Sequence, residues 1–204
     1  MNESILSAWD IAEAQPATDA NPRELLIHAV NYAILAPSSH NSQPWQFRIT
    51  GEQLELYADR TRALAVVDHA DRELVISCGA ALFCVRATLQ HLGVEPLIEL
   101  EPEGPASDLL ARVGVGKRRS ATEADHALFQ AITQRRTTRT PFEARDLPDT
   151  LQRSLADAAE GEGAALWVMR TPQQRTELAE LIAQADQEQW SDPRVRRELA
   201  AWIH

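Results

Sequence analysis

The first clear pattern along the chain is a run of apolar residues at helical spacing over residues 22–36. Residues that favour a helix start precede and open it: Asn21 as N-cap, Pro22 in the first turn and Glu24 at the third position. Pro37 ends the run. Apolar and polar residues then alternate over 45–49 and 54–58, on either side of Gly51. The chain is therefore expected to form a helix, a polar loop and a β-hairpin.

The strongest apolar segment, residues 71–92, predicts a helix that is central and buried. Residues such as Val75 and Ile76 widen its apolar stripe nearly all round, and Gly93 suits the position just after its end. Two short strands are expected to follow it, near residues 96–100 and 109–115.

Residues 148–169 partly repeat the order of residues 22–49. A second helix is followed by a short loop and by an apolar stretch, 164–169, that predicts a strand. The second copy lacks the polar loop of the first. We therefore expect two related halves, residues 1–120 and 121–204.

Two more helices are expected near the end of the chain, because Thr171-Pro172 and Asp192-Pro193 each resemble an N-cap followed by a first-turn proline. The last of these helices carries an apolar face at Trp202 and Ile203. We expect a missing segment or a second chain to cover this face.

Composition narrows the class of protein only modestly. The 204 residues are 44% hydrophobic and 25% charged, which is typical of a globular protein, and the net charge of -10 argues against nucleic acid as the main partner. No stretch is expected to be long and apolar enough to span a membrane. Residues 1–15 contain acidic but no basic residues, unlike a secretory signal, so a cytoplasmic location is expected. Cys78 and Cys84 are expected to be reduced core residues.

Two polar stretches carry the candidate chemistry. Residues 36–45 (Ala-Pro-Ser-Ser-His-Asn-Ser-Gln-Pro-Trp) crowd hydroxyls, amides and backbone N–H groups between two apolar elements. Such a polar cluster would not suit a hydrophobic core, whereas it could form hydrogen bonds with a polar planar ligand or with a phosphate. Residues 135–140 hold only arginine and threonine, which suit an anionic tail because charge-assisted hydrogen bonds are strong.

Together these stretches resemble the paired flavin-binding motifs of the FMN-dependent nitroreductase family, and most closely its Acg-like branch, in which two nitroreductase-like halves are fused. The resemblance implies an α+β fold with an antiparallel-rich sheet flanked by helices. It also implies bound FMN, NAD(P)H as reductant and a nitroaromatic or quinone-type electron acceptor. A homodimer or a pseudo-dimer would bring the two motifs together. Because Acg-like proteins are longer, the resemblance also implies that this chain is shortened or is a fragment.

Carried over residue by residue, the resemblance assigns cofactor-binding roles and no catalytic side chain, because the flavin itself performs the chemistry. Arg135, Arg136 and Thr137 would bind the phosphate, and Arg139 would face the N1/O2 edge of the ring. The ribityl chain and the other ring edge would meet Pro37, Ser38, Ser39 and Asn41. Residues 43–45 would hold the loop and start the strand.

Other interpretations of the same residues remain open. The chain could sequester flavin without turnover, or it could be a cofactor-free oligomerisation module. The arginines could be a solvated helix end and the loop an elaborate turn; the basic run 117–119 is expected to be a solvated face. His40 is expected to be a surface or lid-contact residue and not a catalyst. His69 and His91 have no partner at metal-ligand spacing, so no metal is expected. Tryptophans at positions 9, 167, 190 and 202 are expected to be core or interface anchors.

Overall fold

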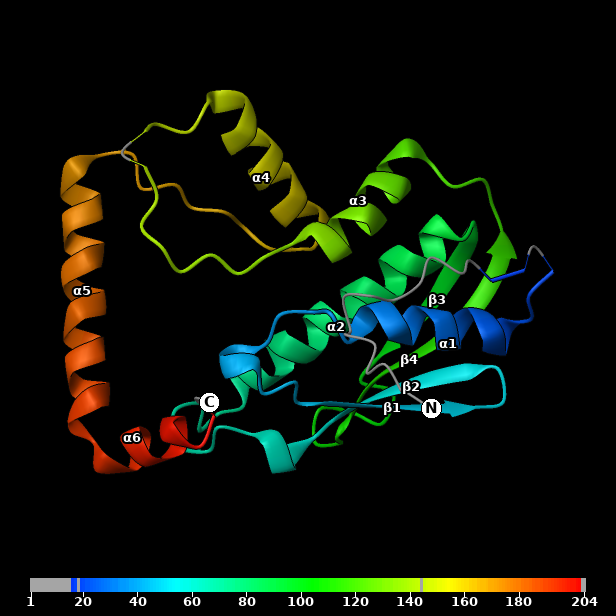
Figure 1. Cartoon of the computed structure of the whole chain (residues 1–204), viewed down its shortest axis with the longest axis horizontal. Coiled ribbons are helices and arrows are strands. Elements are labelled where there is room, and N and C mark those ends of the chain that lie inside the picture. Colours follow the sequence, from blue (N-terminus) through cyan, green and yellow to red (C-terminus); the bar gives the residue numbers. More distant parts are fainter. Residues whose placement is uncertain (1–15, 18, 144, 203–204) are drawn as a thin grey trace, which may run out of the picture. The chain divides into compact units, whose positions relative to one another are not determined.

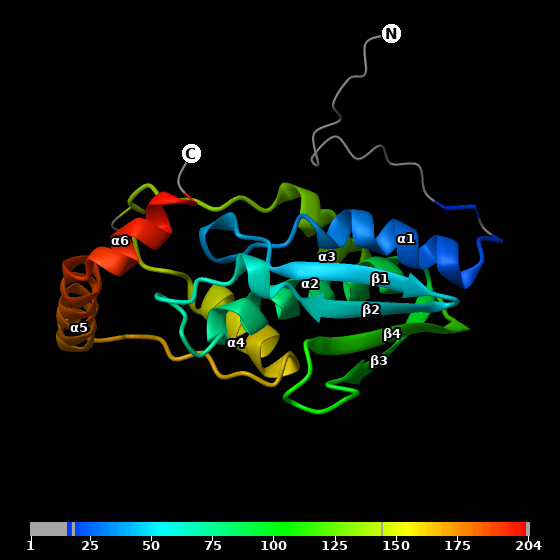
Figure 2. The ribbon, with the colours of Figure 1, turned by 90° about the horizontal axis from the view of Figure 1, so that it is seen from below.

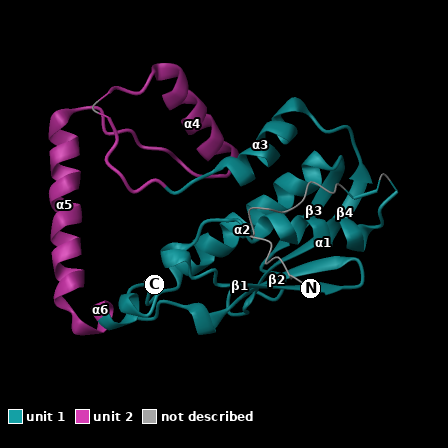
Figure 3. Cartoon of the chain, viewed as in Figure 1, with its two compact units in different colours: residues 1–137, 197–204 teal, residues 138–196 magenta. Residues whose placement is uncertain are grey.

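The computed structural model describes residues 16–17, 19–143 and 145–202. The expectations for Trp9 and Ile203 lie outside these residues. The chain forms two compact units: unit 1 holds residues 1–137 and 197–204, and unit 2 holds residues 138–196 (Figure 3). The expected halves, 1–120 and 121–204, stay a prediction.

Unit 1 consists of helices and one antiparallel sheet, which confirms the expected α+β class (Figure 1). Its four strands lie side by side in the order β1-β2-β4-β3 (Figure 2). The elements in chain order are α1 (Pro22–Ala33), the 3-10 turn η1 (Ser39–Asn41), β1 (Trp45–Thr50), β2 (Gln53–Ala58), the 3-10 turn η2 (Arg60–Arg62), α2 (Arg72–His91), β3 (Val94–Leu100), β4 (Leu109–Arg118) and α3 (Glu123–Gln134).

The predicted start of α1 is confirmed in detail. The Asn21 side chain accepts a hydrogen bond from the Glu24 N–H, and the Glu24 carboxylate accepts one from the Asn21 N–H, both at 3.0 Å. This reciprocal capping box satisfies two donors that the first helical turn would otherwise leave unpaired.

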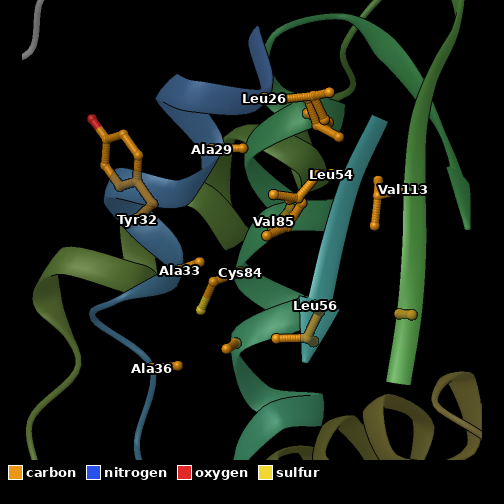
Figure 4. Packing of buried hydrophobic residues seen from close by; sticks show 14 of the residues in the cluster. Leu26, Ala29, Tyr32, Ala33, Ala36, Leu54, Leu56, Cys84, Val85 and Val113 are labelled. Atoms are coloured by element: carbon orange, nitrogen blue, oxygen red, sulfur yellow. The ribbon is translucent and has the colours of Figure 1, made fainter. Parts of the chain in front are cut away.

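The core of unit 1 lies between α1, α2 and the inner face of the sheet (Figure 4). Leu26 of α1, Val85 of α2 and Leu54 of β2 are all fully buried there. The expectation of a central helix near 71–92 is confirmed, with one correction. Val75 and Ile76 are 47% and 68% exposed, because the neighbours of α2 do not cover this side of its first turns.

The length and composition of α2 would also allow it to cross a membrane. The expectation that no stretch of the chain has this character was therefore wrong. Half of the apolar window of α2 is buried inside the structure, as in the core helix of a globular unit.

Charged side chains of alternating sign cross the outer face of the sheet. The Arg48 guanidinium of β1 lies 2.7 Å from the Glu55 carboxylate of β2, which Arg112 of β4 approaches to 3.4 Å. Arg112 in turn lies 3.6 Å from Glu99 of β3. Since opposite-charge pairs on neighbouring strands stabilise a sheet, this row suits the polar face, while the opposite face packs on the helices.

Unit 2 contains α4 (Asp149–Gly161), α5 (Pro172–Ser191) and the first half of α6 (Pro193–Ala200). The strand expected at 164–169 is not formed. A strand requires a hydrogen-bonding neighbour, and the described residues of unit 2 include no other strand. Trp167 is 82% exposed, so it is not a core anchor, and its role as an interface anchor stays a prediction.

Candidate functional site

The loop between α1 and β1 has an unusual backbone. His40, Asn41 and Gln43 adopt left-handed conformations, with φ of 51°, 55° and 50°. Each such non-glycine residue costs on the order of 1–3 kcal/mol and persists only where its surroundings hold it in place. Three of them within four positions indicate a loop with a specific, maintained shape, and conformations of this kind cluster at functional sites.

Contacts from the loop itself and from α1 maintain part of this shape. The Gln43 N–H donates to the Ser38 hydroxyl at 3.0 Å, and the Gln43 side-chain amide donates to the Ile34 carbonyl at 3.2 Å. Trp45 is buried and begins β1. Residues 43–45 thus have the supporting role expected from the sequence.

The first turns of α2 support the other side of the loop. The Ser39 N–H donates to the Ser77 hydroxyl at 3.4 Å, and the Ser39 hydroxyl donates to the Glu73 carboxylate. The cavity between the loop, residues 62–68 and α2 has a volume of about 10 Å³, which is too small for a ring system. Sequence reasoning missed Glu73 and Ser77, because nothing in the spacing of a buried helix shows which of its polar residues lies under a distant loop.

Two buried thiols lie on the same helix. The Cys78 thiol donates to the Pro44 carbonyl at 3.2 Å, which further anchors the loop. Burial raises the pKa of Cys78 to about 12 and that of Cys84 to about 11. Both cysteines are free, so the expectation of reduced core residues is confirmed, and neither thiol ionises near neutral pH.

The structure brings Arg135 to the start of the loop, although 100 positions separate it from Leu35. Arg135 lies at the C-cap of α3, and its guanidinium donates to the Leu35 carbonyl at 3.1 Å and to the Thr137 hydroxyl at 3.2 Å. Among the described residues, no carboxylate pairs with Arg135. On a protein with a net charge of -10, a cation without an acidic partner beside a polar loop suits an anionic ligand.

The remaining expected site residues differ in how they are placed. The Arg136 guanidinium donates to the backbone carbonyls of Thr133 and Arg135, at 2.6 and 2.8 Å, as a helix-end residue would. Pro37 and Asn41 are exposed on the loop. Arg139 is exposed and belongs to unit 2, whereas the loop belongs to unit 1. The role of Arg139 beside the loop therefore stays a prediction.

No family model matches the chain. Among solved structures, the "Crystal structure of the Nitroreductase Family Protein from Streptococcus pneumoniae TIGR4" is similar, with a TM-score of 0.37 and 18% sequence identity. That similarity covers 62% of this chain and 90% of the solved chain.

Curated relatives are more similar in sequence. The "Putative NAD(P)H nitroreductase Rv3131" of Mycobacterium tuberculosis (strain ATCC 25618 / H37Rv) is 32% identical over 170 residues, which are 83% of this chain and 48% of the relative. The "Putative NAD(P)H nitroreductase acg" of the same strain is 34% identical over 119 residues, which are 58% of this chain and 36% of the relative. The chain thus spans half or less of the length of these two relatives. Over these segments the chain is thus similar in sequence to proteins named putative NAD(P)H nitroreductases, including acg.

Proposed function

We propose that the chain binds FMN and takes part in NAD(P)H-dependent reduction of nitroaromatic or quinone-type acceptors. The observation that carries the proposal is Arg135, which has no carboxylate partner among the described residues and contacts the carbonyl that precedes the strained loop. The names of the relatives support NAD(P)H as the reductant.

The residues of unit 1 fit the polar parts of FMN. A guanidinium has five N–H donors, and Arg135 keeps some of them after its contacts with Leu35 and Thr137. The Thr137 hydroxyl accepts from Arg135 and can still donate to a phosphate oxygen. The exposed amide of Asn41 can pair with a donor or an acceptor at a ring edge.

The chain's own residues would bind and orient the cofactor. FMN, when bound, would supply the two-electron chemistry between NAD(P)H and an acceptor. Because Glu73 and Ser77 fill the α2 side of the loop, the flavin would meet the loop from its solvent side. Arg139 would supply positive charge at the N1/O2 edge, where it stabilises negative charge on the ring.

The test is the visible absorbance of the full-length chain after addition of FMN and gel filtration, with Arg135→Ala, Arg139→Ala and Arg23→Ala compared. Arg23 is a matched control, because it is an exposed arginine at the first turn of α1, about 18 Å of helix away from Leu35. We expect the wild type and R23A to retain flavin bands. R135A should bind FMN about tenfold or more weakly, since it loses a charge-assisted hydrogen bond.

Turnover requires a separate measurement. Steady-state oxidation of NAD(P)H by the FMN-loaded chain, with a nitroaromatic or quinone acceptor, should exceed that of free FMN. Bound flavin without such oxidation would favour the sequestration hypothesis. Failure of the wild type to retain any FMN would overturn the proposal and favour the cofactor-free oligomerisation module.

A further inference from the structure

Two histidines from neighbouring helices meet at the surface of unit 1, away from the α1–β1 loop. His91 lies in the last turn of α2 and His126 in the first turns of α3. Their Nδ1 atoms are 2.8 Å apart, and the two rings are nearly perpendicular, at 84°. Sequence spacing showed no partner for His91, because the two residues are 35 positions apart and come together only when the helices pack.

The separation of the two nitrogens suits a shared metal ion. Divalent transition metals bind imidazole nitrogen at about 2.0–2.1 Å, so two nitrogens at a right angle on one ion lie about 2.9 Å apart, and at a tetrahedral angle about 3.3 Å. The observed spacing is closer to the right angle. Right angles between neighbouring ligands are typical of tetragonal Cu²⁺ and Ni²⁺ sites with nitrogen and oxygen ligands.

The His91 ring is held in position before any ion binds. It stacks on Phe129 of α3 with ring centroids 3.9 Å apart and planes inclined by 13°. Phe129 in turn packs against Tyr32 of α1 at 4.5 Å.

Water would complete the coordination. Among the described residues, no group of three or more His, Cys, Asp or Glu side chains is placed to hold a metal ion. Asp125, next to His126 in sequence, is already engaged by Arg119 and Thr122. His126 is exposed, so ions and water can reach the pair from solvent.

We propose that His91 and His126 form a two-imidazole site for a divalent transition-metal ion of the Cu²⁺ type, which links the end of α2 to the start of α3. An ion that binds the folded chain and not the unfolded chain stabilises the fold. It would also hold α3 in place, and Arg135 is the C-cap residue of that helix.

The test is a titration of metal-free, full-length chain with CuCl₂, followed by calorimetry and by the Cu²⁺ electron paramagnetic resonance spectrum. The variants are His91→Gln and His126→Gln, with His69→Gln as the control, because His69 is exposed in another segment. We expect calorimetry to give one ion per chain, and the Cu²⁺ spectrum to show superhyperfine splitting from two ligand nitrogens. Each of the first two variants should bind at least about tenfold more weakly, and H69Q should match the wild type.

The thermal midpoint in chelator shows whether the variants fold, and Cu²⁺ should raise it in the wild type more than in either variant. If the His91→Gln variant does not fold, the His126→Gln variant is used to test the proposal, because His126 is exposed. The proposal fails if the wild type binds no Cu²⁺, or if H126Q binds it with the wild-type affinity and spectrum. The two rings would then be joined by a hydrogen bond alone.

Discussion

Two glycines with left-handed backbone differ in what surrounds them. Gly51, in the turn between β1 and β2, has φ of +60° and nothing within 4 Å of the position that a Cβ would take. Gly93, just after α2, has φ of +71°, and a Cβ there would lie 2.7 Å from the Arg119 carbonyl oxygen. The Gly93 carbonyl also accepts the Arg119 N–H at 2.8 Å. Gly93 is therefore required both for its backbone angle and for close approach to a neighbouring segment.

Substitution of each glycine by alanine should separate these two requirements. Gly51→Ala should lower the free energy of unfolding by about 1–2 kcal/mol, the cost of a left-handed non-glycine residue. Gly93→Ala should lower it by more, because the backbone around Arg119 must also move. Urea unfolding of both variants checks the difference, and equal losses would show that the approach of Arg119 relaxes without cost.

The sequence identified the glycine at the end of α2 but not its neighbour. Gly93 follows an apolar helical stripe, so its capping position could be read directly. Its contact with Arg119 depends on packing between segments that are distant in sequence. The same limit applies at the α1–β1 loop. The sequence motif indicated Ser39, but the residues that hydrogen-bond to Ser39 are Glu73 and Ser77 of α2. The apolar pattern of α2 does not show which of its faces lies against the loop.

At the scale of elements, local signals predicted the starts of α1, α5 and α6. Capping boxes at α1, α3 and α5 each use an N-cap side chain and the residue three positions later, and such signals lie within one turn of sequence. The prediction of a strand at 164–169 was wrong, because an apolar stretch is also compatible with coil where no partner strand is available among the described residues. Arg119 was expected to be solvated, but it pairs with Asp125 at 2.8 Å.

The α3 cap should make stability depend on pH. Hydrogen bonds from Arg119 and then from Thr122 hold the pKa of Asp125 well below its usual range. A carboxyl group whose pKa is lower in the folded state stabilises the fold above its unfolded pKa, about 3.9, and this contribution is lost as the pH falls toward the folded pKa. Asp125→Asn should therefore lower the free energy of unfolding at pH 7, by about 1–2 kcal/mol.

Urea unfolding of the wild type and D125N at several pH values measures this effect. The difference between them should be constant from pH 7 down to about 5 and should shrink below about 4, because Asp125 of the unfolded wild type then takes up a proton while the folded state still excludes it. A difference that does not change with pH would mean that the asparagine disturbs the cap through its shape and not through its charge.

At the scale of the whole molecule, the candidate motif 135–140 lies across the boundary between the two units. Arg135 and Thr137 belong to unit 1, whereas Arg139 belongs to unit 2. The residues described from 135 to 148 form no helix or strand, and nearly all of them are exposed. A segment of this kind is where a protease is expected to cut first.

Brief digestion with trypsin should therefore cut after Arg136, Arg139 or Arg145 before it cuts at arginines inside helices such as Arg153 in α4 and Arg175 in α5. Cleavage after Arg139 gives fragments 1–139 and 140–204, which mass spectrometry distinguishes. If the motif binds flavin as proposed, saturating FMN should slow these first cuts several-fold, because Arg135 and Arg139 would be engaged. Cleavage after Arg175 should keep its rate and serves as the internal control. First cuts within α4 or α5 would show that the helices of unit 2 open more readily than the segment that joins them to unit 1.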